Sequence, residues 1–391
     1  MNDMISRRTL LRGAGALGVI GAGGLAWRGA VQHVLEPVSG PAYEPWGRWP
    51  AELGRADGLG WVAAAVLASS PHNTQPWTFE VGPRHVDVLA DLERNLGAFD
   101  PFRRELHTGL GCTVENVVQA AAAAGQKATV TLLPAPGRPE HVARITWQPA
   151  PANPSLADVI GRRHVNRGPY DGRPVGDEGL RRVRAAEGAS AARLVLIESA
   201  SQAGARFAAE TLEATRAINE DQEMSETSER WMRHAWRDIQ THRDGLTLAA
   251  LSLPPALRTM AMMLPALSQD AFKKGWVRST EEGLSTSPVY GLIVVPDLDD
   301  RLGQLEAGRL WQRVHLEATR LGLAAQPLNQ WMERVDRERQ LRGTAPSAQG
   351  MAAVTGLSEW RPTFAFRLGY PVRPALPSPR RPVEAVARRV A

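Results

Sequence analysis

The sequence feature that most constrains the fold is a long apolar segment, ended by a glycine, that occurs twice along the chain. Residues 108–124 and residues 305–321 each have the apolar spacing of a helix, and a glycine follows each one. The two segments match at an offset of 197 residues, and the chain of 391 residues is about twice that offset. Three matches of common residues are weak alone, but with the length they suggest two copies of one unit. The matches are Val117, Ala121 and Gly125 against Val314, Ala318 and Gly322.

The length and composition indicate a globular protein with two domains. A chain of 391 residues is too long for one typical compact domain. Hydrophobic residues make up 43% and charged residues 22%, which excludes disorder as the main state. The single cysteine, Cys112, excludes a disulfide framework, a thiolate zinc site and a CxxC redox pair. No motif for metal binding or for a nucleophilic serine occurs, so we expect no metal ion.

The excess positive charge lies at the N-terminus. The formal net charge is +5, but residues 1–30 hold four arginines and one aspartate, and without them the net charge falls to +2. The rest of the chain is nearly neutral, so we expect no nucleic-acid partner. Residues 6–12, SRRTLLR, resemble a twin-arginine export signal, with Leu10 where phenylalanine is commoner. The apolar run that follows, residues 17–26, is too short for a transmembrane helix.

We therefore expect residues 1–30 to be a signal segment that is read by the twin-arginine export machinery. The protein would then be exported to the periplasm or cell envelope, with the segment either cleaved or kept as a weak anchor. The alternative is a cytoplasmic protein whose basic N-terminus arose by chance.

Composition also divides the rest of the chain. Residues 31–56 are rich in proline and tryptophan without a period, and we expect an extended arm. Proline-rich residues 149–154 mark a boundary between a first unit at 57–150 and a second unit at 151–391. The second unit contains an insertion at about 222–286, charged at first and then rich in Met and Leu. It is either a lid over a binding site or a plain helical subdomain.

The predicted secondary structure is mixed, which gives an α+β fold class. Strands are predicted from β-branched runs bounded by turn residues, and helices from apolar spacing and caps. Strands are expected at 78–81, 85–89, 128–133, 142–147, 193–197, 289–295 and 363–368, and helices at 57–68, 108–124, 155–163 with Ser155 as N-cap, from Ser201 onward, and at 305–321.

The most specific motif is residues 69–77, SSPHNTQPW. Pro71 and Pro76 exclude a helix and make this a rigid polar loop, whose amides can hydrogen-bond the edge of a flat heterocycle. Trp77 would anchor the loop in the core. The string resembles the SSxxNxQPW loop of the nitroreductase family of FMN enzymes, with Asn73 and Gln75 at the family's spacing. In that family the loop binds the flavin, and Ser70 belongs to it.

A second motif, residues 162–170, places three arginines just after a short predicted helix. Such a cluster suits a phosphate dianion. It resembles the family's Arg-x-Ser/Thr-x-Arg/Lys motif, whose residues hold the FMN phosphate and ribityl chain. Arg163 and Arg167 fit this pattern and enclose His164, whereas Val165 stands where the family has a hydroxyl group. The resemblance therefore implies one polar contact fewer.

Two further segments complete the resemblance. Residues 322–330 follow a long predicted helix, where the family has a loop over the flavin near N5. Asn329 and Gln330 stand where relatives often have Glu-Gly or a glycine-rich pair, so bulkier side chains would narrow access to the reactive face. Arg380 and Arg381 lie near the C-terminus, where family members carry basic phosphate ligands. The Acg-like branch also carries a stretch like Asp91, Arg94, Asp100-Pro101, Arg103 and Glu105 after the first loop.

The resemblance covers roughly residues 55–385 and implies a fused architecture. Family enzymes are usually homodimers that build each flavin site from both subunits. Here the first half has the SSPHNTQPW loop without an arginine cluster before it, whereas the second half has the cluster, the helix loop and the basic tail. The chain thus resembles the Acg-like branch, in which two nitroreductase-like units form an intramolecular pseudo-dimer. It would be a monomer with one FMN at the internal interface.

The resemblance implies an FMN-binding oxidoreductase that passes hydride from NAD(P)H to a nitroaromatic, quinone or similar small-molecule acceptor. The flavin does this chemistry, so no side chain is expected to be catalytic. An exported enzyme would need a quinone or protein donor, because NAD(P)H is a cytoplasmic reductant. The alternative is a non-catalytic FMN-binding or storage protein with a lidded site. The expected cofactor-binding residues are Ser70, Asn73, Gln75, Arg163, His164, Arg167, Pro327, Leu328, Asn329, Gln330, Arg380 and Arg381.

Overall fold

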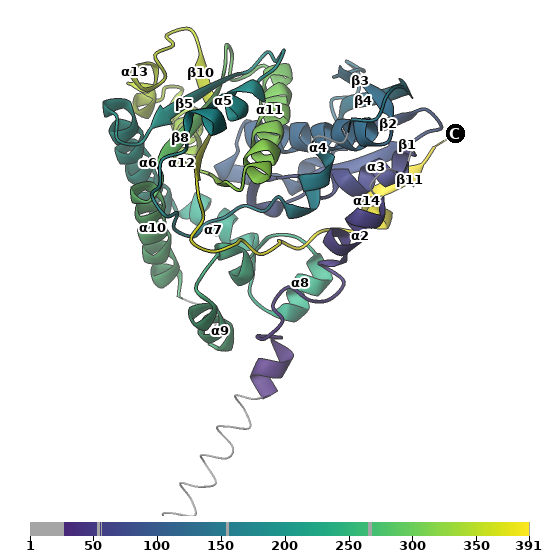
Figure 1. The fold of residues 1–391 in the computed structure, drawn as a ribbon. Helices are drawn as coiled ribbons and strands as arrows, with labels where there is room; N and C mark the ends of the chain where they lie inside the picture. The colour runs from purple at the N-terminus through teal and green to yellow at the C-terminus, as the bar shows by residue number, and fades with distance from the viewer. Residues whose placement is uncertain (1–26, 53–54, 56, 154–155, 265–267, 391) are drawn as a thin grey trace, which may run out of the picture.

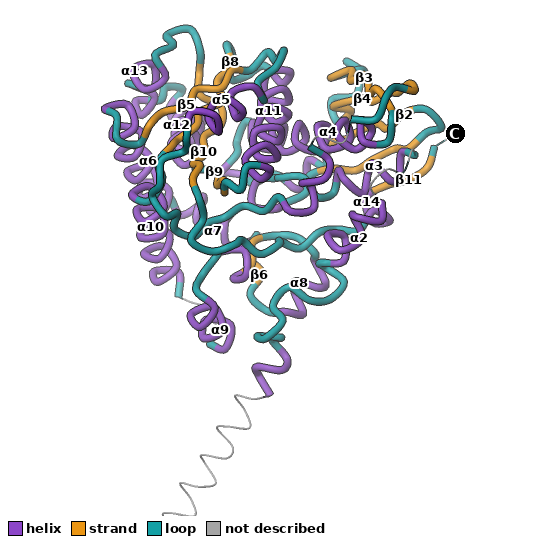
Figure 2. The backbone as a smooth tube through the Cα atoms, viewed as in Figure 1, coloured by secondary structure: helices purple, strands orange, loops and turns teal. Residues whose placement is uncertain are grey.

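The structure is a computed structural model that describes residues 27–390 except 53–54, 56, 154–155 and 265–267. The fold is α+β, as expected, with two separate β-sheets and a pair of long helices between them (Figures 1 and 2). Most of the expected signal segment, residues 1–26, lies outside the described residues.

The first sheet has the strand order β11-β1-β2-β4-β3. Four of its strands come from the first half of the chain and pair antiparallel. The fifth, β11 at Ala387–Arg389, comes from the C-terminus and pairs parallel with β1. In Figure 1 the yellow C-terminal segment crosses from the second half of the molecule to reach this edge. The other strands are β1 Trp77–Val81, β2 His85–Ala90, β3 Gln126–Leu132 and β4 His141–Pro149.

The second sheet has the order β5-β8-β10-β9, with every neighbouring pair antiparallel. Its central strand β8, Val289–Val295, is buried at every residue and reads as a continuous apolar run, because both of its faces are covered. The others are β5 Arg193–Glu198, β9 Ala324–Pro327 and β10 Arg361–Gly369. A short pair outside both sheets consists of β6 Met232–Arg233 and β7 Leu246–Thr247.

The two halves repeat one topology. In each, two strands precede a long helix and two strands follow it, and the sheet order β1-β2-β4-β3 equals β5-β8-β10-β9 position by position. The long helices are α4, Arg104–Ala123, and α11, Arg301–Arg320, each of 20 residues and offset by 197. The repeated spacing in the sequence therefore marks two structurally equivalent helices. Gly125 and Gly322, which follow them, both have positive φ, as the predicted helix ends require.

Helices α4 and α11 pack directly on each other, and equivalent residues meet. A Cβ atom at Gly111 would lie 2.1 Å from the carbonyl oxygen of Leu305, and one at the equivalent Gly308 would lie 2.0 Å from that of Thr108. Only glycine allows the two backbones to approach so closely. His107 Nδ1 and Gln304 Oε1, another equivalent pair, lie 2.6 Å apart.

Two predicted segments differ from the structure. Residues 31–56 are not simply extended, because residues 44–52 form helix α2, in which Trp46 and Trp49 are buried on one face. The spacing of three places both rings against the core. The helix expected at 155–163 is a 3₁₀ helix over Ala157–Arg162, a form usual for short connections, and its expected N-cap at residue 155 lies outside the described residues.

The remaining helices cover the outer faces of the two sheets and form the insertion. Within the described residues no helix is long and apolar enough to cross a membrane. The α-helices are α2 Glu44–Glu52, α3 Gly58–Ala65, α5 Asp177–Ala185, α6 Gln202–Glu220, α7 Gln222–Arg230, α8 Trp236–His242, α9 Pro255–Met263, α10 Gln269–Ser285, α12 Gln330–Arg342, α13 Met351–Thr355 and α14 Val383–Val386; the further 3₁₀ helices are Pro71–Asn73, Leu92–Arg94, Gly97–Phe99, Leu248–Leu251 and Pro346–Ala348.

Candidate functional site

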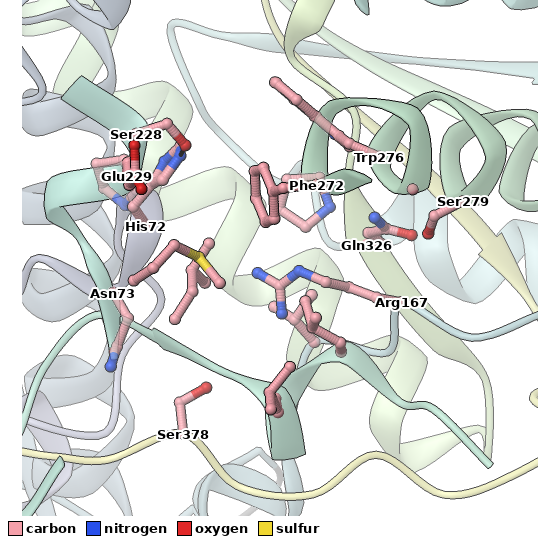
Figure 3. Close-up of a pocket in the computed structure, with 18 of the residues that line it drawn as sticks. His72, Asn73, Arg167, Ser228, Glu229, Phe272, Trp276, Ser279, Gln326 and Ser378 are labelled. Carbon is pink, nitrogen blue, oxygen red and sulfur yellow. Dashed lines mark hydrogen bonds between the residues drawn. The ribbon is translucent and has the colours of Figure 1, made fainter. Parts of the chain in front are cut away.

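A cavity of about 610 Å³ lies where the two halves, the insertion and the C-terminal segment meet. Its volume is in the range of ligand and cofactor sites. The first half contributes the loop before β1 and the start of α4, and the second half contributes residues 163–167, Trp311 and the β9–α12 junction. Figure 3 shows labelled side chains from the loop, the insertion and the tail around a common space. A ligand bound here would contact both halves.

The loop before β1 has a backbone conformation that few non-glycine residues adopt. His72, Asn73 and Gln75 have φ of 44°, 57° and 52°, in the left-handed region. Such conformations persist only where the surrounding structure fixes them. Here the backbone N–H of Gln75 donates to Ser70 Oγ at 3.0 Å, and the two prolines restrict the rest of the loop. The loop is therefore a rigid wall of the cavity.

Asn73 joins this loop to the tail. Its Nδ2 donates to the carbonyl oxygens of Gly245 and Pro379 at 3.1 and 3.0 Å. Its Oδ1 accepts from Arg380 Nη1 at 2.6 Å. Asn73 also lines the cavity, as does Ser70. Both residues therefore line the cavity, and their contact with a flavin stays a prediction.

Gln75 and Arg381 have a different role from the expected one. Gln75 is fully buried; its Oε1 accepts from the backbone N–H of Arg381 at 2.8 Å, and its Nε2 donates to the carbonyl oxygen of Arg243 at 2.8 Å. The Arg381 guanidinium donates to the carbonyl oxygen of Gln75 at 3.3 Å. Neither residue lines the cavity in the described part of the chain. These hydrogen bonds connect the loop to the tail and to the insertion.

The cavity has a cationic corner formed by Arg163 and Arg380, which are 1% and 3% exposed. Arg163 donates to Ser69 Oγ and to the carbonyl oxygen of Leu67, both at 2.9 Å. Both guanidinium carbons lie over the Trp46 ring, at 6.0 and 4.7 Å from its centroid. Among the ion pairs of the described residues, none involves either arginine. Two buried cations therefore lie close together without an anion.

The two buried guanidinium groups have no negative charge beside them to offset their own charge. Burial lowers the pKa of Arg163 to about 10, and burial together with the charge of Arg163 lowers that of Arg380 well below its usual value. Polar nitrogens without a hydrogen-bond partner among the described residues gather here: the Nε of both arginines, His164 Nδ1 and His315 Nε2. Buried cations and donors normally have partners. An anion bound in this corner could supply the missing partners.

The two histidines in this corner do not add charge. Burial and the adjacent guanidinium groups lower the pKa of His164 to about 3 and that of His315 well below its usual value. His164 packs edge-on against Trp46, with the ring centroids 4.5 Å apart. Neutral imidazoles can still offer a hydrogen bond to a bound group.

Arg167 lies apart from this corner. Its Nη1 donates to the carbonyl oxygen of Ala250 at 3.1 Å, and its backbone N–H donates to Ser252 Oγ at 3.2 Å. Its guanidinium reaches toward the middle of the cavity, below Phe272 in Figure 3. Burial lowers its pKa to about 10. Arg167, expected with Arg163 to hold the phosphate and ribityl chain, therefore faces the central space and not the corner of Arg163 and Arg380.

The β9–α12 junction forms another part of the wall. Pro327, Asn329 and Gln330 line the cavity, whereas Leu328 packs in the apolar core beside Trp331. Asn329 uses its side chain internally, because Nδ2 donates to Glu105 Oε1 at 2.9 Å and Oδ1 accepts from the backbone N–H of Ala365 at 2.8 Å. Leu328 is therefore a core residue, and Asn329 holds the junction in place.

Several lining residues were missed by the sequence analysis. Glu105 was noted only as part of the Acg-like stretch, although it lies on α4 and faces the cavity. Glu333 lies on α12, a polar helix without the apolar spacing that predicts one. Trp46 was assigned to the expected arm. The structure describes no group of three or more His, Cys, Asp or Glu residues placed to hold a metal ion.

The insertion supplies an apolar wall. Its contribution is mostly aliphatic and aromatic, and Figure 3 shows Phe272 and Trp276 on the α10 side of the space. His72, in the loop before β1, bonds to Ser228 of the insertion at 3.0 Å. The insertion is therefore part of the site. Its apolar lining residues include Met232, Leu248, Leu251, Leu253, Met262, Phe272 and Trp276.

The sequence is similar to curated proteins of Mycobacterium tuberculosis. One, named "Putative NAD(P)H nitroreductase", is 29% identical over 338 residues, which cover 83% of this chain and 89% of that protein. Another of that name, acg, is 35% identical over 113 residues, which cover 28% of this chain and 34% of its own. No protein-family model matches the chain.

Solved structures give weaker matches. The FMN-dependent nitroreductase NfnB from Mycobacterium smegmatis, in complex with NADPH, covers 60% of this chain and 97% of its own at 14% identity, with a TM-score of 0.38. A nitroreductase with bound FMN from Desulfitobacterium hafniense covers 60% and 98%, also at 14% identity, with a TM-score of 0.37. TM-scores of this size do not establish a common fold, so the relationship rests on sequence. Over most of its length the chain is thus similar in sequence to a mycobacterial protein named as a putative NAD(P)H nitroreductase.

Proposed function

We propose that the chain is an FMN-dependent oxidoreductase of the nitroreductase type. The observation that carries this proposal is the pair of buried arginines without an anion, Arg163 and Arg380, beside a loop of the family's flavin-binding pattern. Charge-assisted hydrogen bonds to a phosphate would use the donors that now have no partner. The names of the mycobacterial relatives, putative NAD(P)H nitroreductases, support the reaction class and the donor.

The residues present fit FMN by chemistry as well as by charge. Arg163, Arg380 and His164 would hold the phosphate, and Asn73 and Arg167 would face the more central part of the molecule. FMN supplies hydride transfer when bound. The chain itself binds and orients, and its apolar insertion excludes water from the reacting groups.

The apolar wall favours a flat, weakly polar electron acceptor. Phe272 and Trp276 offer aromatic faces, and the surrounding Met and Leu side chains adapt to different shapes. A nitroaromatic compound or a quinone fits this description. The same wall is compatible with a storage protein that holds FMN without turnover, so the decisive test is turnover.

The first experiment is spectroscopic. The purified protein should be yellow, NAD(P)H should bleach the flavin absorbance, and a quinone or nitroaromatic compound should restore it. A yellow protein that NAD(P)H and chemically reduced quinol both fail to bleach would be a storage protein. A colourless protein that does not take up added FMN would overturn the proposal altogether.

We also propose that the chain is a fused pseudo-dimer that is exported. The repeated strand order supports the fusion, and residues 6–12 support a twin-arginine signal. Replacing Arg7 and Arg8 by lysine should leave the flavin content unchanged and retain the protein inside the cell. Cell fractionation with flavin fluorescence measures both. Export of the double-lysine protein at the wild-type level would favour the cytoplasmic alternative.

A further inference from the structure

A second cluster of charged residues faces the cavity at the start of α12. Glu105 of α4 and Glu333 of α12 both line the cavity and are 5% and 6% exposed. Their carboxyl groups lie within hydrogen-bonding reach of each other, and Glu105 also accepts from Asn329 Nδ2 at 2.9 Å. Glu333 Oε2 and Gln330 Oε1 have no hydrogen-bond partner among the described residues. Two buried acceptors on one face of α12 therefore lack a protein partner among the described residues.

The surrounding charges do not neutralise this pair. Arg104 Nε donates to Asp336 Oδ2 at 2.6 Å, whereas its Nη2 lies 3.9 Å from Glu105 Oε1. Asp336 also lies 3.6 Å from Arg339 Nη1. A further buried carboxylate, Asp100, accepts from the backbone N–H groups of Glu105 and Leu106 at 3.0 and 2.8 Å. Asp336 thus forms the closest ion pair with Arg104. The carboxyl groups of Glu105, Glu333 and Asp100 have no cation at a comparable distance among the ion pairs of the described residues.

Two carboxyl groups in mutual contact and out of water hold a proton between them, because both cannot be ionised there. Burial raises the pKa of Glu105 to about 7. Burial and the Glu105 charge raise the pKa of Glu333 well above its usual value. Burial and mutual repulsion therefore favour a protonated carboxyl group at this wall of the cavity.

We propose that Glu105 and Glu333 share one proton, and that Glu333 delivers it as a general acid to the electron acceptor bound against the insertion. This inference rests on the proposed function. An acceptor with a carbonyl or nitro oxygen that takes up a hydride gains two electrons and one proton, and becomes an anion. One further proton, transferred from Glu333 to that oxygen, gives the neutral product. The O–H bond of the acid breaks, an O–H bond of the product forms, and the pair regains a proton from solvent.

The site predicts the class of acceptor. Gln330 and Glu333 lie three residues apart on α12, so they present an amide and an acid group side by side to the cavity. An acceptor with an oxygen on a flat apolar ring would place its ring against Phe272 and its oxygen toward Glu333. Quinones and nitroaromatic compounds have this form, whereas an acceptor without a protonatable oxygen would gain nothing from the acid.

The test uses the FMN-loaded full chain and compares Glu333→Gln with Glu338→Gln. Glu338 is on the same helix, but it bonds to Ser347 and does not line the cavity. General acid catalysis contributes 10²–10⁴-fold, so Glu333→Gln should lower kcat with a quinone by about 100-fold or more at pH 7, whereas Glu338→Gln should not. Wild-type kcat should fall as pH rises through the pKa of Glu333, which burial and the Glu105 charge raise well above its usual value. Glu333→Asp should restore part of the kcat that Glu333→Gln loses.

A readout independent of turnover is the infrared band of a protonated carboxylic acid. The wild type at pH 6 should show a band from a buried acid that weakens in Glu333→Gln and persists in Glu338→Gln. Equal kcat and an unchanged pH profile in Glu333→Gln, with full flavin content, would overturn the general acid. Absence of flavin from the wild type would instead count against the proposed function, so the two failures are distinguishable.

Discussion

At the scale of single residues, the main feature of the site is a pair of buried positive charges without an ion-pair partner among the described residues. Arg163 and Arg380 are removed from water and rest on Trp46, where a cation–π contact compensates for only part of the lost hydration. An unpaired buried charge destabilises the folded chain, so such a pair persists where a ligand completes it. Under the proposed function, these two arginines would form one half of an ion pair, and the phosphate of the bound flavin would form the other half.

Replacing Arg163 by alanine should weaken FMN binding by roughly 10- to 100-fold, because a charge-assisted hydrogen bond contributes about 1.5–3 kcal/mol. The matched control is Arg162→Ala, since Arg162 is the adjacent arginine and its side chain is 65% exposed. Fluorescence titration with FMN and with riboflavin measures both. Riboflavin should bind the wild type poorly and lose little more in Arg163→Ala. Equal affinity of the wild type for the two flavins would remove the phosphate role.

Stability should depend on pH through Glu105 and Asp100. Burial raises their pKa values to about 7 and about 6, above unfolded values of about 4.3 and 3.9. The folded chain therefore binds more protons than the unfolded chain between these limits. Their contribution to the free energy of unfolding is fully present below about pH 4 and is lost as pH rises through about 6 to 7.

Glu105→Gln isolates this effect, because glutamine does not ionise and its Oε1 can still accept from Asn329. Relative to the wild type, the variant should gain about 1–3 kcal/mol more in free energy of unfolding at pH 8 than at pH 5. Urea unfolding at the two pH values measures this difference. The same difference at both pH values would mean that Glu105 is ionised in the folded chain at pH 5 as well as at pH 8.

At the scale of elements, the close contact of α4 and α11 decides how the two halves sit together. Gly111 and Gly308 are equivalent positions in the repeated helices, and each lies against backbone of the other helix. Any side chain there must push the helices apart. The cavity has walls on both halves, so this spacing also sets its width.

Gly111→Ala should destabilise the chain by about 1–3 kcal/mol, the usual effect of inserting a methyl group into a packed interior. Gly47→Ala is the control, because Gly47 lies in helix α2 with no atom within 4 Å of the added Cβ, and alanine there should stabilise by up to about 1 kcal/mol. Thermal unfolding compares the two. A neutral Gly111→Ala would show that the helices separate without loss.

The same elements show what sequence can predict. Strand β8 was predicted at its observed bounds, 289–295, because a fully buried strand is apolar throughout. Helix α4 begins four residues before the predicted start, because Arg104 and Glu105 are buried through polar contacts that apolar spacing does not register. Helix α12 was missed for the same reason. The motifs predicted Asn73, Arg163 and Arg380 at the cavity, whereas Gln75 and Arg381 turned out to bond to each other.

At the scale of the whole molecule, the chain forms one site from segments far apart in sequence. The loop before β1 meets residue 380 through Asn73, and the C-terminal strand β11 pairs with the first sheet. The long helix of the first half, α4, packs against the equivalent helix of the second half, α11. A second chain is therefore not needed to complete the cavity, since both halves and the tail of one chain supply its walls.

One FMN per chain in a monomer is the expected stoichiometry. Arg163 and Arg380 form the cationic corner. The first half of the sequence has no arginine cluster before its SSPHNTQPW loop, so we expect no second corner of this kind. Flavin released by denaturation and measured against protein should approach one per 42.5 kDa, and light scattering should give that mass for the loaded protein. Because a ligand in this cavity would contact both halves, FMN loading should also raise the midpoint of unfolding in proportion to the logarithm of free FMN. Two flavins per chain, or a site that forms only in a dimer, would contradict the assignment of one internal site to the fused repeat.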